Sequence, residues 1–349
     1  MRVGVVGCGY WGSKHVRVLH GIPEVAQVVA IDPSEDRLLS LKLAFPGLVT
    51  FSNLQAAVDH VDAVIIATPP RTHVPLALEA LAGGKSVLVE KPLATGSAGA
   101  LRMIGEASAR SLVLMVGHTF EYNAAVWKLR ELIQTGELGR VYYLDSARLN
   151  LGLYQPDVNV IWDLAPHDVS IMNYVLGATP VRVQAWGSRH GHHLLEDVAY
   201  LRLLYADPEV TANIHVSWLD PCKVRRTTVV GSRKMAVYND LSSDEPIRIF
   251  DKGVVTPEDD AGLQNIPMSY RYGEIRAPFV SFQEPLSVQD REFVSCALTG
   301  QRPRTHGYSG LSVVQVLECA QLSLDTGRPV SVAEAAVVDD PESELVKAS

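Results

Sequence analysis

Paired cysteines, long apolar runs and an excess of basic residues are all missing from this chain of 349 residues. The four cysteines, Cys8, Cys222, Cys296 and Cys319, lie far apart and form no CxxC pair. This usage is typical of reduced thiols in a reducing compartment and argues against a zinc cluster. No apolar stretch approaches the roughly 20 residues of a membrane span, and the first residues lead directly into a strand-like run without the regions of a signal peptide. We therefore expect a cytoplasmic protein with no membrane segment and no bound metal.

Acidic residues outnumber basic ones, 39 to 31, which gives a formal net charge of −8. Nucleic-acid partners normally meet a broad basic surface, so none is expected here. Hydrophobic residues make up 47% and charged residues 20% of the chain, as in ordinary globular proteins. The length exceeds the roughly 100 to 200 residues of one domain, so we expect two domains. Disorder is expected only from about Asp339 to Ser349.

Residues 1–120 alternate short apolar runs with helical stretches. The strand candidates are 2–6, 25–31, 48–51, 62–68, 86–90 and 112–117, and the helical candidates lie near 11–20, 34–44, 54–60, 72–82 and 98–109. Apolar strands separated by helices predict a parallel sheet covered on both faces. We therefore expect residues 1–120 to be α/β in class, a doubly wound Rossmann domain that binds ligands beyond the carboxyl ends of its strands.

Three glycines, Gly7, Gly9 and Gly12, follow the first strand with GxGxxG spacing. In dinucleotide-binding turns the first glycine allows a tight turn, the second lets a pyrophosphate approach, and the third allows close helix packing. Asp32 follows the second strand, where an acid is expected to hold the adenosine ribose hydroxyls. Because a 2′-phosphate would meet this carboxylate, the pattern predicts NAD rather than NADP as the cofactor.

Two further strand ends carry chemical groups. Thr68-Pro69-Pro70 follows the fourth strand and Glu90-Lys91-Pro92 the fifth. Most lysines are solvated surface charges. Lys91, however, directly follows a buried type of strand, and we expect it to reach the crevice where the nicotinamide lies and to donate to a substrate oxygen.

From about residue 121 the pattern changes to longer strands with few helices. A helix is expected over 122–135, ending at Gly136, followed by strands near 141–151, 181–188, 197–205, 209–218, 225–232 and 235–240. This order predicts an α+β domain over residues 121–349 with a large, mostly antiparallel open sheet. We expect it to bind the substrate and to bury its open sheet face in a homodimer or homotetramer.

The segment NVIWDLAPHDVSIMNYVLG has helical periodicity in its later part. Asp163 is predicted to cap the helix, with Pro166 and His167 in the first turn, where a proline is tolerated. Asp163 and His167 are four residues apart and therefore share one helix face. The positive end of the helix dipole favours a neutral histidine, which can accept a proton. The alternative is a capping aspartate beside a histidine that belongs to the core.

The motifs GCGYWG, TPP, EKP, WDLAPHD and the late EPLSVQDREFVSCALTG, together with Asp32, resemble the glucose-fructose oxidoreductase / inositol dehydrogenase / MocA (Gfo/Idh/MocA) family to about residue 330. The resemblance implies that Lys91 is the catalytic lysine and that Asp163 and His167 belong to the second-domain helix. It also implies a cis bond before Pro92. The residues that it places around NAD are Tyr10, Trp11, Thr68, Pro69, His73 and Glu90. Many members carry arginine where this chain has Glu121, which leaves the neighbouring contacts open.

Within the family, NLGLYQPDVNVIWDLAPHD is most similar to enzymes that oxidise nucleotide-activated sugars, such as UDP-N-acetylglucosamine 3-dehydrogenases. Asn123, Arg148 and Tyr154 are the expected substrate-binding residues. Arg148, with Lys223, Arg225 and Arg226, can form a basic pocket for a diphosphate. Strand arginines are, however, more often solvated.

The expected reaction moves a hydride between a sugar secondary alcohol and NAD, with His167 as base and Lys91 as donor to the reacting oxygen. A dehydrogenase of a free sugar or inositol, a ketosugar reductase, an NAD-dependent glycosidase and a non-catalytic sensor are the alternatives. The histidines in the segment RHGHH, residues 189–193, lack a cysteine or acid at a metal-ligand spacing, so we interpret this segment as a loop.

Overall fold

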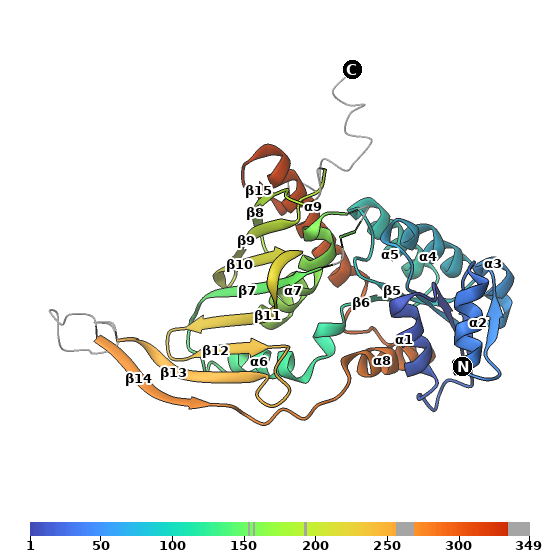
Figure 1. The fold of residues 1–349 in the computed structure, drawn as a ribbon, viewed down its shortest axis with the longest axis horizontal. Coiled ribbons are helices and arrows are strands. Elements are labelled where there is room, and N and C mark those ends of the chain that lie inside the picture. Colours follow the sequence, from blue (N-terminus) through green and yellow to red (C-terminus); the bar gives the residue numbers. More distant parts are fainter. Residues whose placement is uncertain (153, 156–157, 192–193, 256–268, 334–349) are drawn as a thin grey trace, which may run out of the picture. The chain divides into compact units, whose positions relative to one another are not determined.

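The computed structural model describes residues 1–152, 154–155, 158–191, 194–255 and 269–333. They form two compact units (Figure 1). Unit 1 contains Met1–Tyr122 and Gln283–Glu318, and unit 2 contains Asn123–Phe282 and residues 319–333. The units are therefore not the two continuous ranges expected above, because a late segment returns to the first unit. The segment from Asp339 onward lies outside the described residues.

Unit 1 is built on a six-stranded parallel sheet in the order β3-β2-β1-β4-β5-β6. The order reverses beside β1, which confirms the predicted doubly wound sheet. Nearly every residue of the central strands is buried, which explains their continuous apolar sequences. The strands are β1 (Arg2–Val6), β2 (Gln27–Ile31), β3 (Val49–Phe51), β4 (Ala63–Ile66), β5 (Ser86–Glu90) and β6 (Leu114–Gly117).

Helices connect these strands close to the predicted places. They are α1 (Tyr10–Leu19), α2 (Glu35–Ala44), α3 (Leu54–Ala57), α4 (His73–Ala82) and α5 (Ser97–Ala109), with short 3₁₀ turns at Val58–His60, Pro70–Thr72 and Thr119–Tyr122. Ser34 and Asn53 cap α2 and α3 through their side chains. Such caps satisfy N–H groups that the first helical turn leaves without a partner.

Two late helices also contribute to unit 1, namely α8 (Pro285–Thr299) and the first part of α9 (Gly307–Thr326). Leu286, Phe293 and Val294 of α8 belong to the same buried core as Val3 and Val5 of β1. Burying side chains of this size typically stabilises a fold by roughly 1.5–3 kcal/mol each. The late segment is therefore part of the first core.

Unit 2 is built on a nine-stranded sheet in the order β14-β13-β12-β11-β7-β10-β9-β8-β15. Among the described strands of this sheet, only β7 and β10 pair in parallel, which confirms the mostly antiparallel sheet. The strands are β7 (Val141–Leu151), β8 (Arg182–Ser188), β9 (Val198–Ala206), β10 (Glu209–Ser217), β11 (Leu219–Gly231), β12 (Met235–Asn239), β13 (Ile247–Val255), β14 (Ser269–Arg276) and β15 (Val330–Ser331).

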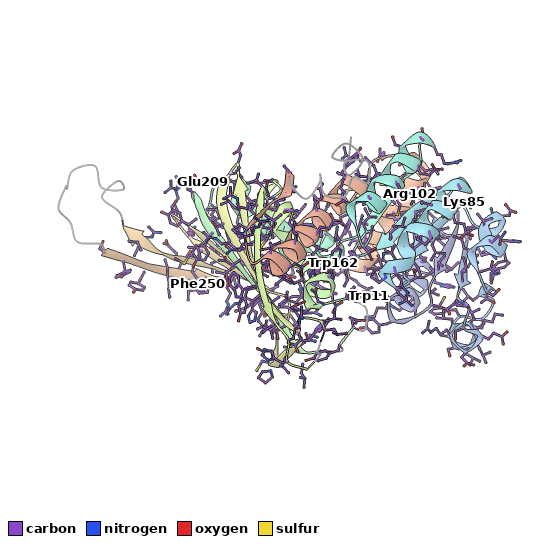
Figure 2. The ribbon with its side chains drawn as sticks, turned by 90° about the horizontal axis from the view of Figure 1, so that it is seen from above. Trp11, Lys85, Arg102, Trp162, Glu209 and Phe250 are labelled. Atoms are coloured by element: carbon purple, nitrogen blue, oxygen red, sulfur yellow. The ribbon has the colours of Figure 1, made fainter. Side chains whose placement is uncertain are left out.

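Helices cover one face of this sheet. The helix α7 (Val160–Leu176) packs on β7, β9 and β10, and α6 (Ala124–Gln134) packs against α7 and β12. In Figure 2 the labelled Trp162 marks α7 on that side of the sheet. No helix in the described part of the chain is long and apolar enough to cross a membrane.

The beginning of α7 differs from the prediction. Asn159, not Asp163, is the N-cap, and its side chain accepts a hydrogen bond from Trp162 N. Asp163 is the fourth residue of the helix, and Pro166 and His167 are the seventh and eighth, beyond the first turn. The argument that the helix dipole keeps His167 neutral therefore loses its basis, because this effect fades beyond the first turn.

Candidate functional site

The glycine turn after β1 has the shape of a dinucleotide cradle. Gly7 has a φ of +87°, and a Cβ on Gly12 would lie 1.7 Å from the Gly7 carbonyl oxygen, so neither position accepts a side chain. A Cβ on Gly9 would meet nothing within 4 Å. The first and third glycines thus serve the turn and the helix packing, whereas the second leaves open space for a ligand.

The N-terminus of α1 faces the same turn. Gly9 is the N-cap and makes no side-chain cap hydrogen bond. An uncapped helix N-terminus presents N–H groups and the positive end of the dipole to an anion such as a pyrophosphate. Tyr10 and Trp11 in this first turn are exposed, at 72% and 38%, and Lys14 lies over both rings. Their contacts with NAD, which the family resemblance implies, stay a prediction.

Asp32 is almost fully buried at the end of β2. Its carboxylate accepts hydrogen bonds from Cys8 N (2.7 Å) and Ser34 N (2.8 Å), and Arg37 Nη1 lies 3.4 Å away. Asp32 therefore ties the glycine turn to the neighbouring strand end. Two accepted main-chain bonds leave lone pairs on a carboxylate, so a ribose hydroxyl can still donate to it.

His73 joins the ends of β4 and β5. Its Nε2 is 2.9 Å from Thr68 O, and its Nδ1 is 2.8 Å from Pro92 O. Burial lowers the pKa of His73. The Lys91–Pro92 bond is cis, as predicted, and a second cis bond precedes Pro208. Both ring nitrogens of His73 thus face main-chain carbonyl oxygens inside unit 1, although the prediction placed this residue around NAD.

Glu90 is also engaged within the protein. Its carboxylate lies 3.1 Å from His15 Nε2 and accepts a hydrogen bond from Lys91 N at 3.2 Å. Lys91 itself follows β5 at the carboxyl edge of the sheet, the edge that also carries Gly9 and Asp32. Lys91 therefore lies at the expected edge of the sheet and contacts Glu90 through its main chain, whereas its role toward a substrate stays a prediction.

His118, directly after β6, was not among the predicted site residues. It is 1% exposed, and neither ring nitrogen has a hydrogen-bond partner in the described part of the chain. Burial, with the nearby charge of Lys91, lowers the pKa of His118 to about 4, so the ring is neutral. Buried polar atoms without partners are costly and rare, and a role in binding or catalysis is one explanation for them. Its position at a strand end was the signal in the sequence that could have revealed it.

In unit 2, Asp163 and His167 share one face of α7, as their spacing predicts. Asp163 Oδ2 accepts a hydrogen bond from Trp218 Nε1 at 3.0 Å. The ring of Trp218 packs against Tyr154, with ring centroids 5.3 Å apart, and Tyr154 donates to Asp197. Burial raises the pKa of Tyr154, and the adjacent Asp197 acts in the same direction. The structure therefore connects Asp163 to Tyr154 through Trp218, a contact that no local pattern reveals.

The predicted basic pocket does not form as one cluster. Arg148 is buried and donates two hydrogen bonds to Asp168, at 2.6 and 3.2 Å. Arg225 lies opposite Arg148 on β11 and pairs with Asp240, whereas the next residue, Arg226, points to the other face of the sheet. Side chains alternate between faces along a strand, so neighbouring arginines separate. The negative partners also neutralise the two cations that do share a face.

Asn123 serves chiefly as a helix cap. Its Oδ1 accepts a hydrogen bond from Ala125 N, and its Nδ2 donates to the Tyr238 hydroxyl at 3.2 Å. Tyr238 in turn donates to Asp240. The amide that we expected to contact a sugar hydroxyl is thus engaged in local structure.

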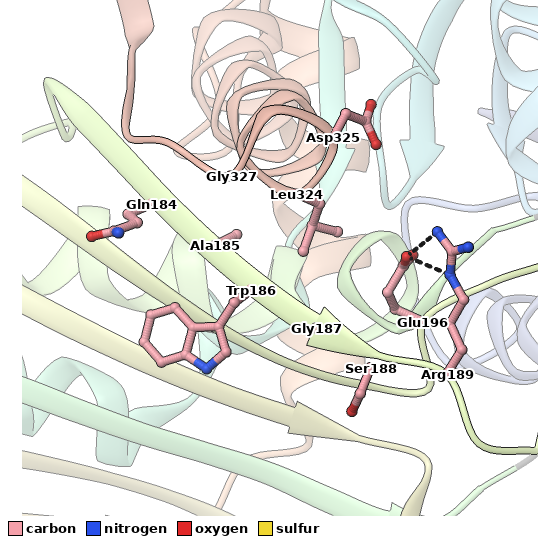
Figure 3. A pocket seen from close by; sticks show the side chains of 10 residues that line it. All are labelled: Gln184, Ala185, Trp186, Gly187, Ser188, Arg189, Glu196, Leu324, Asp325 and Gly327. Carbon is pink, nitrogen blue, oxygen red and sulfur yellow. Dashed lines mark hydrogen bonds and ion pairs between the residues drawn. The ribbon is translucent and has the colours of Figure 1, made fainter.

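The described part of RHGHH lies between β8 and β9, beside a polar hollow of about 730 Å³ at the edge of β8 (Figure 3). Arg189 pairs with Glu196 at 2.6 Å, and His190 Nε2 lies 3.0 Å from Ser188 Oγ. His192 and His193 lie outside the described residues. Among the residues that the structure describes, no group of three or more histidine, cysteine or acidic side chains is arranged to hold a metal.

Two family models match the chain. The one described as "Oxidoreductase family, NAD-binding Rossmann fold" matches residues 1–118, and the one described as "GFO/IDH/MocA C-terminal domain" matches residues 126–237. The first match covers the glycine turn, Asp32 and Lys91, and the second covers α7. The candidate residues of each unit therefore lie in a matched segment.

Individual relatives have sugar- or polyol-related names. Inositol 2-dehydrogenase 2 of Saccharopolyspora erythraea is 32% identical over 216 residues, 60% of this chain and 63% of the relative. UDP-N-acetylglucosamine 3-dehydrogenase of Acidithiobacillus ferrooxidans is 35% identical over 190 residues, 54% of this chain and 58% of the relative. The matched segments thus span about three-fifths of these two relatives. The structure of GenD2 from gentamicin A biosynthesis in complex with NAD superimposes with a TM-score of 0.79 at 25% identity, covering 95% of this chain and 96% of that one.

Proposed function

This chain belongs to the Gfo/Idh/MocA family of oxidoreductases with an NAD-binding Rossmann domain, and from that premise we propose that it is an NAD-dependent dehydrogenase that oxidises a secondary alcohol of a sugar. Unit 1 binds the cofactor and unit 2 binds the sugar. The observation that carries the proposal is the position of Lys91, directly after β5 at the sheet edge that also carries the glycine cradle and Asp32.

His167, Lys91 and Asp163 have different roles in the proposed reaction. Bound NAD would accept the hydride that leaves the alcohol carbon. His167 takes the hydroxyl proton as the carbonyl bond forms, and Lys91 stabilises the negative charge that develops on the same oxygen. Asp163, held by Trp218, orients the sugar or the imidazole. The protein mainly positions the reactants, because the cofactor supplies the redox chemistry.

Absorbance at 340 nm tests this function directly. Purified protein with NAD and a panel of sugars should form NADH with at least one of them. Conversion of a sugar without net NADH would instead indicate an NAD-dependent glycosidase. Binding without any turnover across the panel would contradict the dehydrogenase and favour a sensor.

The finer proposal is oxidation at C3 of a nucleotide-activated sugar. The match to UDP-N-acetylglucosamine 3-dehydrogenase supports it, although the separated arginines of β7 and β11 supply no ready diphosphate pocket. UDP-N-acetylglucosamine and myo-inositol, tested side by side, separate the two best-supported classes. Turnover of inositol alone would reject the nucleotide-sugar assignment.

We also propose that a second copy of the chain covers the face of the unit 2 sheet opposite α7. A shallow hollow of about 490 Å³ on that face contains a row of stacked rings, Trp186, Tyr200 and His215, on three adjacent strands. Trp186 is 53% exposed and Tyr200 is 38% exposed. Apolar patches of this kind are typical of interfaces. Light scattering should give about twice or four times the 38.0 kDa chain mass, and a monomer at micromolar concentration would reject the interface.

A further inference from the structure

His15, Glu90 and Asp290 form a buried polar cluster inside unit 1. His15 lies in α1, Glu90 ends β5 and Asp290 lies in α8. His15 Nδ1 is 2.9 Å from Asp290 Oδ2, and His15 Nε2 is 3.1 Å from Glu90 Oε1. The side chains of His15 and Asp290 are fully buried, and that of Glu90 is 9% exposed. Three ionisable groups are thus brought together from distant parts of the chain.

A protonated His15 satisfies this geometry. Both ring nitrogens face carboxylate oxygens, and only an imidazolium donates from both. Burial alone would lower the pKa of His15, but the charges and hydrogen bonds of Asp290 and Glu90 outweigh it and raise the pKa to about 10. Burial would likewise raise the pKa of Glu90, but the hydrogen bond and charge of His15 hold it below its usual value. Burial keeps the pKa of Asp290 raised.

The second oxygen of Glu90 connects the cluster to the proposed catalytic lysine. Glu90 Oε2 accepts a hydrogen bond from the main-chain N–H of Lys91. The neighbouring strand leaves room for this carboxylate, because a Cβ on Gly117 of β6 would lie 2.9 Å from Glu90 Cδ. A rotated Glu90 would lose both the imidazolium and the peptide N–H.

We propose that Asp290 and His15 are positioning residues that keep Glu90 ionised and thereby orient the peptide that carries Lys91. Asp290 stabilises the protonated form of His15, and His15 stabilises the ionised form of Glu90. Glu90 accepts the hydrogen bond from the Lys91 main chain. The Lys91 side chain then leaves the sheet edge in a fixed direction. The inference rests on the proposed function only for the role of Lys91, since the contacts themselves lie within unit 1.

The other titratable groups near Glu90 cannot replace His15. Lys91 follows Glu90 directly, and His73 of α4 and His118 after β6 sense the charges of both residues. Burial favours the neutral form of these two histidines. Among these histidines, His15 is therefore the one whose positive charge stabilises the Glu90 carboxylate. The charge of His15 in turn depends on Asp290.

Two NMR titrations test the proposal without any substrate. In wild-type protein labelled at histidine Cε1, the His15 signal, assigned with His15→Gln, should stay constant from pH 6 to 9. In Asp290→Asn it should titrate with a midpoint below about 8, because burial then dominates. The backbone ¹⁵N signal of Lys91 should be constant in the wild type and should move with the same midpoint in Asp290→Asn. A wild-type His15 that titrates near the ordinary value of about 6.5 would overturn the proposal.

Glu284→Gln is the matched control, because Glu284 at the N-cap of α8 pairs with Arg17 of α1 at the surface. It breaks a tie between the same two helices without touching the cluster. In Glu284→Gln the His15 and Lys91 signals should depend on pH as in the wild type. Asp290→Glu keeps a carboxylate beside His15, so its signals should lie closer to the wild type than those of Asp290→Asn. Equal Lys91 responses in Asp290→Asn and Glu284→Gln would mean that the cluster only holds the helices together, which contradicts the proposal.

Kinetics then connect the cluster to catalysis. With a sugar that is turned over, Asp290→Asn should move the alkaline limb of kcat/KM to lower pH by at least about one unit, since His15 loses its proton earlier. An unmoved limb, despite altered NMR titrations, would reject the positioning role. If no sugar is turned over, the proposed function fails, whereas the two titrations still decide whether the cluster controls the Lys91 peptide.

Discussion

The two units hold their candidate site residues by different means. In unit 1 the main chain does most of the work, since Asp32 accepts from Cys8 N and Ser34 N and Glu90 accepts from Lys91 N. In unit 2 side chains hold side chains, as in the contact of Trp218 with Asp163 and of Arg148 with Asp168. The candidate residues of unit 1 therefore depend on the path of the backbone, whereas those of unit 2 depend on contacts between single side chains.

His167→Asn gives the largest expected effect and tests the substrate half. Removing the proposed base should lower kcat by roughly 10²- to 10⁴-fold, and it should remove the pH dependence that this imidazole causes. Steady-state rates between pH 5 and 9 measure both. Asp163→Asn should be milder and should act partly on KM, because Asp163 orients the reactants. Near-normal turnover with an unchanged pH profile in His167→Asn would place the base elsewhere, with Tyr154 as the next candidate.

Lys91→Met tests the cofactor half. The substitution keeps much of the side-chain bulk but removes the charge at the reacting oxygen, so kcat should fall by roughly 10²- to 10³-fold. NAD binding should be retained. Quenching of the protein fluorescence by NAD measures it. Lys85→Met is the control, because Lys85 lies directly before β5, at the opposite end of the strand from Lys91. Lys85 is labelled in Figure 2. Similar losses in both variants would show that the position of Lys91 has no special role.

Asp32→Ala should reduce NAD affinity by about 10- to 100-fold, the value of one charged hydrogen bond. The preference for NAD over NADP, expected to be at least about tenfold in the wild type, should narrow. Kd values for both cofactors measure this change. Asp36→Ala, at an exposed position in the first turn of α2, should leave both affinities unchanged. Equal wild-type affinities would refute the role given to Asp32.

His118→Leu should have the smallest effect, and it should be a gain in stability instead of a loss of rate or affinity. Replacing a buried ring whose nitrogens have no partner within the described residues should raise the free energy of unfolding by about 1 kcal/mol. Thermal unfolding in the absence of NAD measures it. A gain in stability together with weaker NAD binding would assign the ring to the cofactor site. A destabilised variant would contradict the prediction and show that the ring nitrogens of His118 have hydrogen-bond partners in solution.

The same contrast explains which features were predictable from sequence. The strands of unit 1, the glycine turn and the positions of Asp32 and Lys91 at strand ends follow from spacing along a short stretch of chain. The start of α7 was misplaced because Asp163 has a side chain that caps helices, whereas Asn159 performs that role. Asp163 instead meets Trp218, 55 residues away, and the cation pocket separates because strand residues alternate between faces. Contacts between distant side chains leave no local pattern.

The late return of the chain to unit 1 also constrains how the protein is made. The ribosome completes Met1–Tyr122 well before it reaches α8, whose Leu286 and Phe293 belong to the core around β1. At roughly 5–20 residues per second, this delay is on the order of 10 to 30 seconds. During that interval the nascent Rossmann sheet exposes the apolar surface that α8 later covers. A chain truncated before Gln283 is therefore expected to be a substrate for chaperones and proteases instead of a smaller NAD-binding protein.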